Sequence, residues 1–247
     1  MITGAASGIG AACARRLVQE GAFVYCADLD GDGARTVAGD AGTRSAVALH
    51  LDVTDESNWT AALETVHRGH PHLTALVHAA GISAASPLLQ TSLDDWRRIL
   101  AVNLDGAFLA TKYGIADMAQ HGGSIVLIGS ASGIRPASGA AAYSTSKAGL
   151  AMLARAAAKE CRTDGYPVRV NVVSPGGVKT SLWRSMPFFQ DLVSEHGSEE
   201  AAFAALAGSG PAFANPEEIA EVVLFLLSPA AGQVTGVEIA ADGGYVL

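Results

Sequence analysis

Short runs rich in β-branched residues alternate along the chain with alanine-rich stretches of helical period, and this alternation constrains the fold more than any other feature. It is typical of a parallel sheet covered by helices, because parallel neighbours need a long crossover that is usually a helix. The predicted strands are residues 1–3, 23–27, 47–51, 74–78, 124–128, 168–173 and 237–240. The predicted helices are residues 9–20, 55–68, 92–118, 143–164 and 216–227.

The order of these elements predicts an α/β, doubly wound Rossmann fold, in which a seven-stranded parallel sheet lies between two helical layers. We expect a single domain over residues 1–247, since no linker, internal repeat or low-complexity tract divides the chain. Residues 181–215 hold no predicted strand and come late in the chain. They are therefore predicted to form an insertion over the carboxyl edge of the sheet, where ligands bind in such folds.

Composition excludes several classes of protein. Hydrophobic residues make up 49% of the chain and charged residues 16%, which is enough apolar material for a buried core. The 24 acidic residues outnumber the 16 Lys and Arg residues and give a net charge of -8, so neither nucleic acid nor an anionic membrane is an expected partner. No apolar run approaches the roughly 20 residues of a membrane span, and no secretory leader is recognised. We expect a soluble, cytoplasmic protein.

No metal site is predicted. Cys13, Cys26 and Cys161 are odd in number and scattered, so we interpret them as reduced, buried thiols. His70 and His72 resemble a metal-binding pair, but no acidic or cysteine residue lies close to them in sequence. A solvated loop is the expected structure there.

A glycine-rich segment follows the first predicted strand and opens the first predicted helix, with Gly4, Ser7, Gly8, Ile9 and Gly10 as its members. The first glycine allows a tight turn. The later ones let the backbone approach a pyrophosphate at the helix N-terminus, where free amides and the helix dipole favour an anion. Three glycines alone also fit an ordinary loop, so this segment indicates a dinucleotide site only together with other motifs.

The next predicted strand is followed by Asp28 and Leu29. A carboxylate at this place can accept hydrogen bonds from the adenosine ribose of a dinucleotide, although a plain turn is the alternative. At about 4 Å it would repel a 2′-phosphate by about 4 kcal/mol at an effective dielectric constant of about 20. The glycine turn carries Ser7 and no lysine or arginine that could pair with that phosphate. The predicted cofactor is therefore NAD.

Tyr143 and Lys147 stand four residues apart in a predicted helix, which places a phenol and an ammonium group on one face. This spacing alone also fits an ordinary surface pair. Ser130, however, follows the strand predicted at residues 124–128 and should emerge at the carboxyl edge of the sheet. Asn103 lies in the helix predicted at residues 92–118. These four polar groups are therefore expected to converge beside a nicotinamide ring.

Together these motifs resemble the short-chain dehydrogenase/reductase family in its single-domain, NAD-dependent form. The resemblance covers nearly the whole chain. Beyond the residues already named, it rests on Asp52-Val53, on Ala79-Ala80-Gly81 and on Pro175-Gly176 with Thr180. In combination these motifs are highly specific.

The resemblance implies a role for each site residue. Tyr143 would be the acid/base; because free tyrosine has a pKa of about 10, the Lys147 cation would be needed to favour its phenolate, and it would also hold the nicotinamide ribose. Ser130, with Ser132 as the alternative, would bond the substrate oxygen, and Asn103 would support a water-linked proton path to Lys147. Further cofactor contacts would come from Asp52, Val53, Ala79, Ala80, Gly81, Pro175, Gly176, Val178 and Thr180. A homotetramer is also implied.

Two departures from the family pattern are present. His78-Ala79-Ala80-Gly81 stands where the family usually has Asn-Asn-Ala-Gly, and we expect His78 to replace a structural amide hydrogen bond. Only Met1 and Ile2 precede the glycine turn, whereas the family normally has a full, central first strand. Either the sequence starts late, or the first strand is short and the stability of the fold is in doubt.

Apolar residues of the insertion indicate the substrate class. After Thr180 come Leu182, Trp183, Met186, Phe188, Phe189, Leu192 and Val193, which either line a pocket or pack the insertion onto its own domain. Residues 156–171 and Trp59 resemble bacterial 3β/17β-hydroxysteroid dehydrogenases. Arg184 is the lone charged residue in this group that could bind a carboxylate or phosphate, so a neutral substrate is favoured. We therefore predict hydride transfer between NAD(H) and a secondary alcohol or ketone that is apolar and alicyclic or steroid-like. The alternatives are an NADPH-dependent 3-oxoacyl-type ketoreductase and a catalytically inactive dinucleotide-binding regulator.

Overall fold

The computed structural model describes residues 1–247 and confirms the predicted sheet. Seven strands, all parallel to their neighbours, follow the order β3-β2-β1-β4-β5-β6-β7. The winding direction reverses between β1 and β4, which makes the switch point where doubly wound folds bind ligands. The strands are β1 (Ile2–Thr3), β2 (Val24–Asp28), β3 (Ala46–His50), β4 (Ala75–His78), β5 (Gly123–Ile128), β6 (Val168–Pro175) and β7 (Glu238–Ala241).

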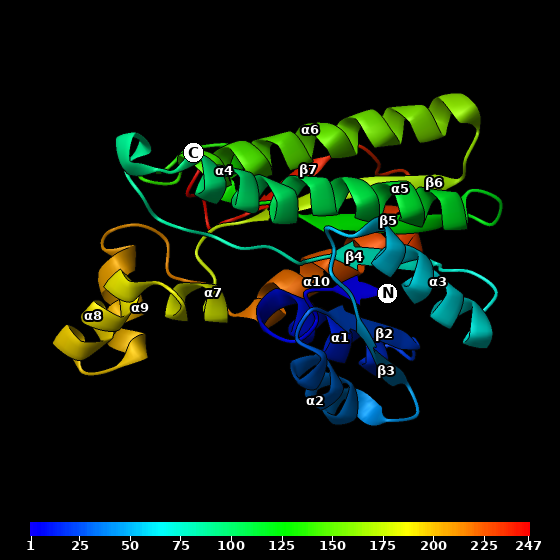
Figure 1. Ribbon diagram of the computed structural model, residues 1–247, viewed down its shortest axis with the longest axis horizontal. Coiled ribbons are helices and arrows are strands. Elements are labelled where there is room, and N and C mark those ends of the chain that lie inside the picture. Colours follow the sequence, from blue (N-terminus) through cyan, green and yellow to red (C-terminus); the bar gives the residue numbers. More distant parts are fainter.

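Helices cover both faces of the sheet (Figure 1). One layer consists of α3 (Glu56–Gly69), α4 (Leu93–Leu100), α5 (Gly106–Met118) and α6 (Ala141–Asp164), and the other of α1 (Gly8–Gln19), α2 (Gly31–Gly42) and α10 (Pro216–Leu227). Successive strand residues enter opposite layers: in β4, Leu76 belongs to a buried cluster of 25 residues on one face and Val77 to one of 21 residues on the other. No helix combines the length and apolarity that a bilayer crossing requires.

The sequence analysis predicts no helix between β2 and β3, and this is wrong, because α2 occupies that connection. Its sequence contains several glycines, which disfavour a helix interior. The Asp30 carboxylate begins the helix by accepting a hydrogen bond from the Gly33 amide at 3.0 Å. The parallel pairing of β2 with β3 requires a crossover, and that requirement outweighs the weak local propensity.

The helix predicted at residues 92–118 is interrupted by a π turn. Helix α4 passes through the π segment η2 (Ala101–Asp105) into α5, and the Gly106 amide donates to the carbonyl of Ala101, five residues earlier. Such π turns occur mostly as single insertions and often at functional sites. This one carries Asn103, one of the predicted site residues.

Residues 181–215 project from the carboxyl edge of the sheet, shown in yellow to orange in Figure 1. They contain α7 (Ser181–Arg184), α8 (Pro187–His196) and α9 (Glu199–Ala207). A separate buried cluster holds this segment together, with Phe189 and Phe203 at a ring-centroid distance of 4.7 Å. The segment returns to the sheet through a parallel bridge between Val178 and Ala214.

The short first strand takes the central place in the sheet. β1 pairs with both β2 and β4, and the Met1 amino group donates to the carbonyl of Ala75 at 2.9 Å. Beside it, His78 at the end of β4 is fully buried, and its Nδ1 lies 2.9 Å from the Thr3 hydroxyl. Burial, with a smaller effect of the Lys147 charge, lowers the pKa of His78 to about 3, so the ring is neutral. The expected structural hydrogen bond of His78 is therefore present.

The two histidines of the segment before β4 lie in a loop, as expected, but they are only partly exposed to solvent. His70 is half-buried, and its Nδ1 lies 2.8 Å from the Tyr25 hydroxyl. His72 is also half-buried and stacks on His121, with ring centroids 4.2 Å apart. Both rings therefore pack against neighbouring side chains. The three cysteine thiols are buried and unbonded.

Candidate active site

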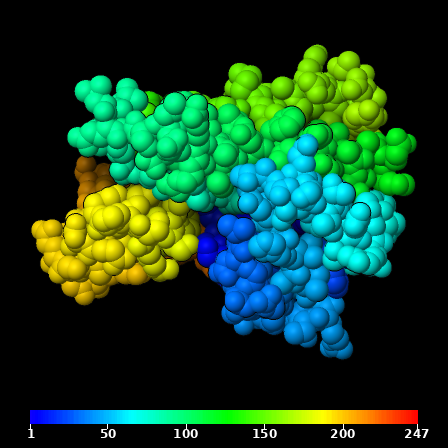
Figure 2. All heavy atoms as spheres, in the orientation of Figure 1, coloured from blue at the N-terminus to red at the C-terminus, as the bar shows by residue number.

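A cavity of about 890 Å³ opens at the carboxyl edge of the sheet. Figure 2 shows the surface hollowed between the insertion in yellow and the N-terminal part in blue. All predicted site residues except Asn103 line this cavity: Gly4, Ser7, Gly8, Ile9, Gly10, Asp28, Leu29, Asp52, Val53, Ala79, Ala80, Gly81, Ser130, Tyr143, Lys147, Pro175, Gly176, Val178 and Thr180. The fold thus brings together motifs that lie far apart in the sequence.

The glycine turn has the geometry of a phosphate cradle. Gly4 and Gly8 have φ angles of +67° and +53°, and a Cβ on Gly10 would fall 2.1 Å from the Gly4 carbonyl oxygen. The backbone therefore turns too tightly for larger residues. Ser7 is the N-cap of α1, but its hydroxyl caps no amide and lies 2.9 Å from the Ser181 hydroxyl. The free amides of α1 suit the pyrophosphate of a dinucleotide.

Asp28 connects the glycine turn to the predicted ribose edge. Its Oδ2 accepts from the Ala6 amide and its Oδ1 from the Asp30 amide, each at 2.9 Å. The carboxylate therefore holds the turn in shape while it also faces the cavity. Leu29 next to it is largely exposed, as a residue beside an open adenosine subsite would be.

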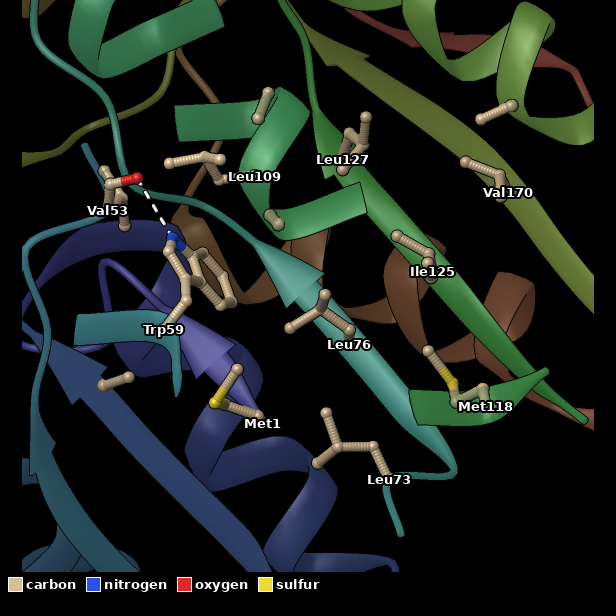
Figure 3. Packing of buried hydrophobic residues seen from close by; sticks show 14 of the residues in the cluster. Met1, Val53, Trp59, Leu73, Leu76, Leu109, Met118, Ile125, Leu127 and Val170 are labelled. Atoms are coloured by element: carbon tan, nitrogen blue, oxygen red, sulfur yellow. Dashed lines mark hydrogen bonds between the residues drawn. The ribbon is translucent and has the colours of Figure 1, made fainter. Parts of the chain in front are cut away.

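A buried tryptophan holds the segment of Asp52 and Val53, two of the predicted cofactor contacts. The Trp59 indole N–H donates to the Val53 carbonyl at 3.0 Å, as the dashed line in Figure 3 shows. Trp59 is fully buried, so it fixes the backbone after β3 and touches no ligand itself. Asp52 forms a short turn in the same segment, because its Oδ1 accepts from the amide of Thr54 at 2.9 Å.

Three of the four predicted catalytic groups meet at one end of the cavity. Ser130 follows β5, as predicted, and its Oγ accepts from the Ser132 amide at 3.1 Å. The Lys147 Nζ donates to the Ile128 carbonyl at 2.9 Å and lies 5.8 Å from the centre of the Tyr143 ring. A phenol, a hydroxyl and an ammonium group thus share one surface, which is an arrangement suited to moving a proton.

Burial determines the titration of this centre. It raises the pKa of Tyr143, while the neighbouring Ser130 hydroxyl acts in the opposite direction. Burial also lowers the pKa of Lys147 to about 8. The resemblance implies that Lys147 favours the Tyr143 phenolate. In the protein without cofactor, burial instead raises the pKa of Tyr143, so the phenol is neutral near pH 7.

Asn103 is placed differently from the prediction. It is fully buried and does not line the cavity. Its Oδ1 accepts from the Ile82 amide at 2.8 Å, and its Nδ2 donates to the Ile82 carbonyl at 2.9 Å and to the Ser146 hydroxyl at 3.0 Å. A Cβ on Gly81 would lie 3.3 Å from Asn103 Oδ1 and 3.4 Å from Lys147 Nζ. Asn103 is therefore buried behind the cavity wall, beside Gly81 and Lys147.

The remainder of the cavity has one small-residue wall and one apolar wall. Ser83–Ala85 and Ala137–Ala140 form the first. Of the predicted apolar group, Leu182, Trp183, Met186 and Phe188 line the second, whereas Phe189, Leu192 and Val193 pack inside the insertion. Phe213 packs against Trp183 and adds to the second wall, and Tyr245 also lines the cavity; neither residue is predicted from the sequence. Both follow loop segments without periodicity, so no local pattern marks them.

Comparison with known proteins gives consistent results. A family model described as enoyl-(acyl carrier protein) reductase matches residues 4–246. The 3-beta-hydroxysteroid dehydrogenase of Comamonas testosteroni is 36% identical over 98% of this chain and 93% of its own length. The cyclopentanol dehydrogenase of Comamonas sp. (strain NCIMB 9872) is 36% identical over 99% of this chain and 95% of its own length.

The fold also has counterparts among solved structures. The 3-ketoacyl-(acyl-carrier-protein) reductase from Brucella melitensis, solved in complex with NADH, superposes with a TM-score of 0.85 at 28% identity. The match covers 100% of this chain and 97% of that chain.

Proposed function

This chain belongs to the short-chain dehydrogenase/reductase family, and we propose that it is an oxidoreductase that interconverts a secondary alcohol and its ketone with NAD(H). The observation that carries the proposal is the convergence of Ser130, Tyr143 and Lys147 in the cavity that also contains the glycine turn. A chain that only bound a dinucleotide would need the turn, but it would have no chemical use for the other three groups.

The chemistry follows from the residue types. Bound NAD would accept the hydride that leaves the carbinol carbon, and the hydroxyl proton of the same alcohol goes to the Tyr143 phenolate. Ser130 donates a hydrogen bond to the substrate oxygen and keeps it near the phenol. Lys147 supplies a positive charge beside the phenolate and, in the cofactor's presence, a donor for the nicotinamide ribose. In the reducing direction Tyr143 returns the proton to the ketone oxygen.

We assign NAD as the preferred cofactor because of the charges at the ribose edge. Asp28 faces the cavity, and Asp30 and Asp32 follow in the same turn. Arg35 in α2 pairs with Asp32, so its charge is already balanced. A 2′-phosphate would be repelled by Asp28 by about 4 kcal/mol at about 4 Å, before salt and relaxation reduce the effect.

The apolar wall supports a neutral ring substrate. Trp183 packs edge-to-face with Phe213 at a centroid distance of 5.2 Å, and both line the cavity. Arg184, the charged candidate in this stretch, forms a two-pronged ion pair with Glu199 and is not available to a carboxylate. The names of the two Comamonas relatives also refer to alicyclic alcohols. We therefore infer an apolar alicyclic or steroid-like alcohol as the substrate.

A substrate and cofactor panel tests this proposal. Cyclopentanol, a 3β-hydroxysteroid, a polyol and a 3-hydroxyacyl thioester are each offered with NAD and with NADP, and reduced cofactor is measured. We expect the highest kcat/KM for a ring alcohol with NAD. A preference for the thioester with NADP would instead establish the ketoreductase alternative, and no turnover of any substrate would support a dinucleotide-binding regulator.

A further inference from the structure

We propose that Ser146 is a positioning residue of this active site, whose hydroxyl holds the Tyr143 turn of α6 against the π turn that carries Asn103. The inference deepens the proposed function and depends on it only for the reaction by which it is measured. It concerns a residue that touches neither cofactor nor substrate, since Ser146 does not line the cavity.

The Ser146 side chain is bonded on both sides. Its hydroxyl donates to the Tyr143 carbonyl at 2.7 Å and accepts from the Asn103 Nδ2 at 3.0 Å. The residue is fully buried, so no water competes for these bonds. Because Asn103 also holds the amide and the carbonyl of Ile82, a continuous chain of bonds runs from the loop after Gly81 to the backbone of Tyr143.

The beginning of α6 needs such support. Tyr143 lies in the first turn of this helix, and the N-cap residue Ala140 provides no side-chain hydrogen bond. No acidic residue in that turn stabilises the helix dipole either. First turns of helices have amides without intrahelical partners and fray unless they are capped or packed. The Ser146 hydroxyl does not cap these amides, but it bonds the Tyr143 carbonyl and Asn103 at once and so ties the first turn to the π turn.

This restraint is important because the phenol must remain close to two fixed groups. Lys147 is anchored by its bond to the Ile128 carbonyl, and Ser130 is anchored by the amide of Ser132. Movement of the Tyr143 turn would separate the phenol from both. Small displacements of reacting groups reduce rates strongly while leaving binding at more distant contacts intact.

The same helix provides a matched control. Ser144 is also buried, with 7% of its surface exposed, but its hydroxyl has no hydrogen-bond partner. Ser146→Ala and Ser144→Ala therefore delete the same atom, two residues apart in one helix. One deletion breaks two bonds and the other breaks none. Ser146→Thr keeps the hydroxyl and serves as the rescue variant.

The experiment measures kcat, the KM for NAD and the pH profile of kcat with whichever substrate the wild type turns over best. For Ser146→Ala we expect kcat to fall about ten-fold, the equivalent of about 1.4 kcal/mol, with the KM for NAD changed less than about two-fold. The apparent pKa of kcat should rise, because the phenol loses part of its contact with Ser130. Ser144→Ala should match the wild type, and Ser146→Thr should recover most of the rate.

Two results would overturn the inference. One is that Ser146→Ala keeps the wild-type kcat and pH profile. If its melting temperature alone falls, the role of Ser146 is purely structural. The other is an equal loss of kcat in Ser144→Ala. If no alcohol or ketone is turned over, the proposed function fails, and hydrogen exchange then tests the role of Ser146. The backbone amides of residues 101–105 and 141–147 should exchange faster in Ser146→Ala than in Ser144→Ala. Equal exchange in the two variants would contradict the inference.

Discussion

At the scale of single residues, Asp28 combines a proposed cofactor role with a backbone role. Its carboxylate faces the cavity and also accepts from the amides of Ala6 and Asp30. Removing the whole side chain would therefore combine two effects, the loss of the negative charge and the loosening of the glycine turn. Asp28→Asn removes the charge and keeps one oxygen acceptor, so it disturbs the turn less than a truncation, although its NH2 group can no longer accept from the second backbone amide.

We predict that Asp28→Asn narrows the preference for NAD over NADP, mainly by a gain of about ten-fold or more in kcat/KM with NADP, because the repulsion of the 2′-phosphate is relieved. Steady-state kinetics with both cofactors provide the measurement, and Asp40→Asn, exposed on α2, is the control. An unchanged ratio of the two efficiencies would place Asp28 outside the ribose subsite.

His78 makes the stability of the protein sensitive to acid. Its pKa of about 3 in the folded state lies below the ordinary histidine value, so the unfolded chain binds the proton more tightly. Stability should therefore fall as the pH decreases from about 6.5 to about 3. The loss amounts to a few kcal/mol, since each pKa unit corresponds to about 1.4 kcal/mol.

His78→Asn should consequently unfold at a lower pH than the wild type, because it has no ring to protonate while its amide can still bond Thr3. Acid unfolding followed by circular dichroism measures the midpoint. His50→Asn, at an exposed histidine, should leave the midpoint in place. A midpoint that is identical in all three proteins would show that His78 does not govern acid sensitivity.

The sequence predicts most of the residues that line the cavity, because most of them belong to motifs next to strand ends, and Tyr143 and Lys147 share one face of a helix. Asn103 is the exception: it does not line the cavity, and it lies in a π turn, whose extra residue the periodicity does not reveal. Ser146 and Phe213 carry no local signal, since their roles come from contacts distant in sequence.

At the scale of elements, an aromatic contact joins the insertion to the loop that follows β6. A Cβ on Gly177 would lie 2.8 Å from the Phe213 ring, so the ring packs directly on the backbone. The Ala214 amide donates to the Gly177 carbonyl at 2.9 Å in the same place. Through Phe213, this contact supports Trp183 and the apolar wall.

We predict that Gly177→Ala displaces the Phe213 ring and raises the KM for a ring alcohol several-fold, with a smaller change in the KM for NAD. Initial-rate kinetics with each substrate varied in turn test this, and Gly39→Ala, where an added Cβ meets nothing within 4 Å, is the control. A larger effect on NAD than on the alcohol would mean that the contact serves the cofactor loop and not the substrate wall.

The elements are predictable where the spacing of the hydrophobic residues and the length of the segment indicate the same type of structure, as for β5, α6 and α10. α2 was missed because its glycines conceal the helical pattern, although the need for a crossover between parallel strands could have revealed it. The helices of the insertion also lie outside the prediction, since their cluster is small and local.

At the scale of the whole molecule, we predict a homotetramer, as the family resemblance implies. Phe108 on α5 and Met152 on α6 are large apolar side chains exposed in the single chain, which suits helix packing between subunits. Light scattering coupled to size exclusion should give about four times the mass of one chain at micromolar concentration. A monomer at that concentration would refute the assembly.

The central claim is that Tyr143 transfers the proton while NAD receives the hydride, and one comparison tests it most directly. NADH formation from a ring alcohol is followed in the wild type and in Tyr143→Phe, with cofactor binding measured by fluorescence titration. We predict that the wild-type rate rises with pH as the phenol ionises, and that Tyr143→Phe binds NADH normally but turns over about a hundred-fold more slowly or less. Wild-type turnover in Tyr143→Phe would contradict the account.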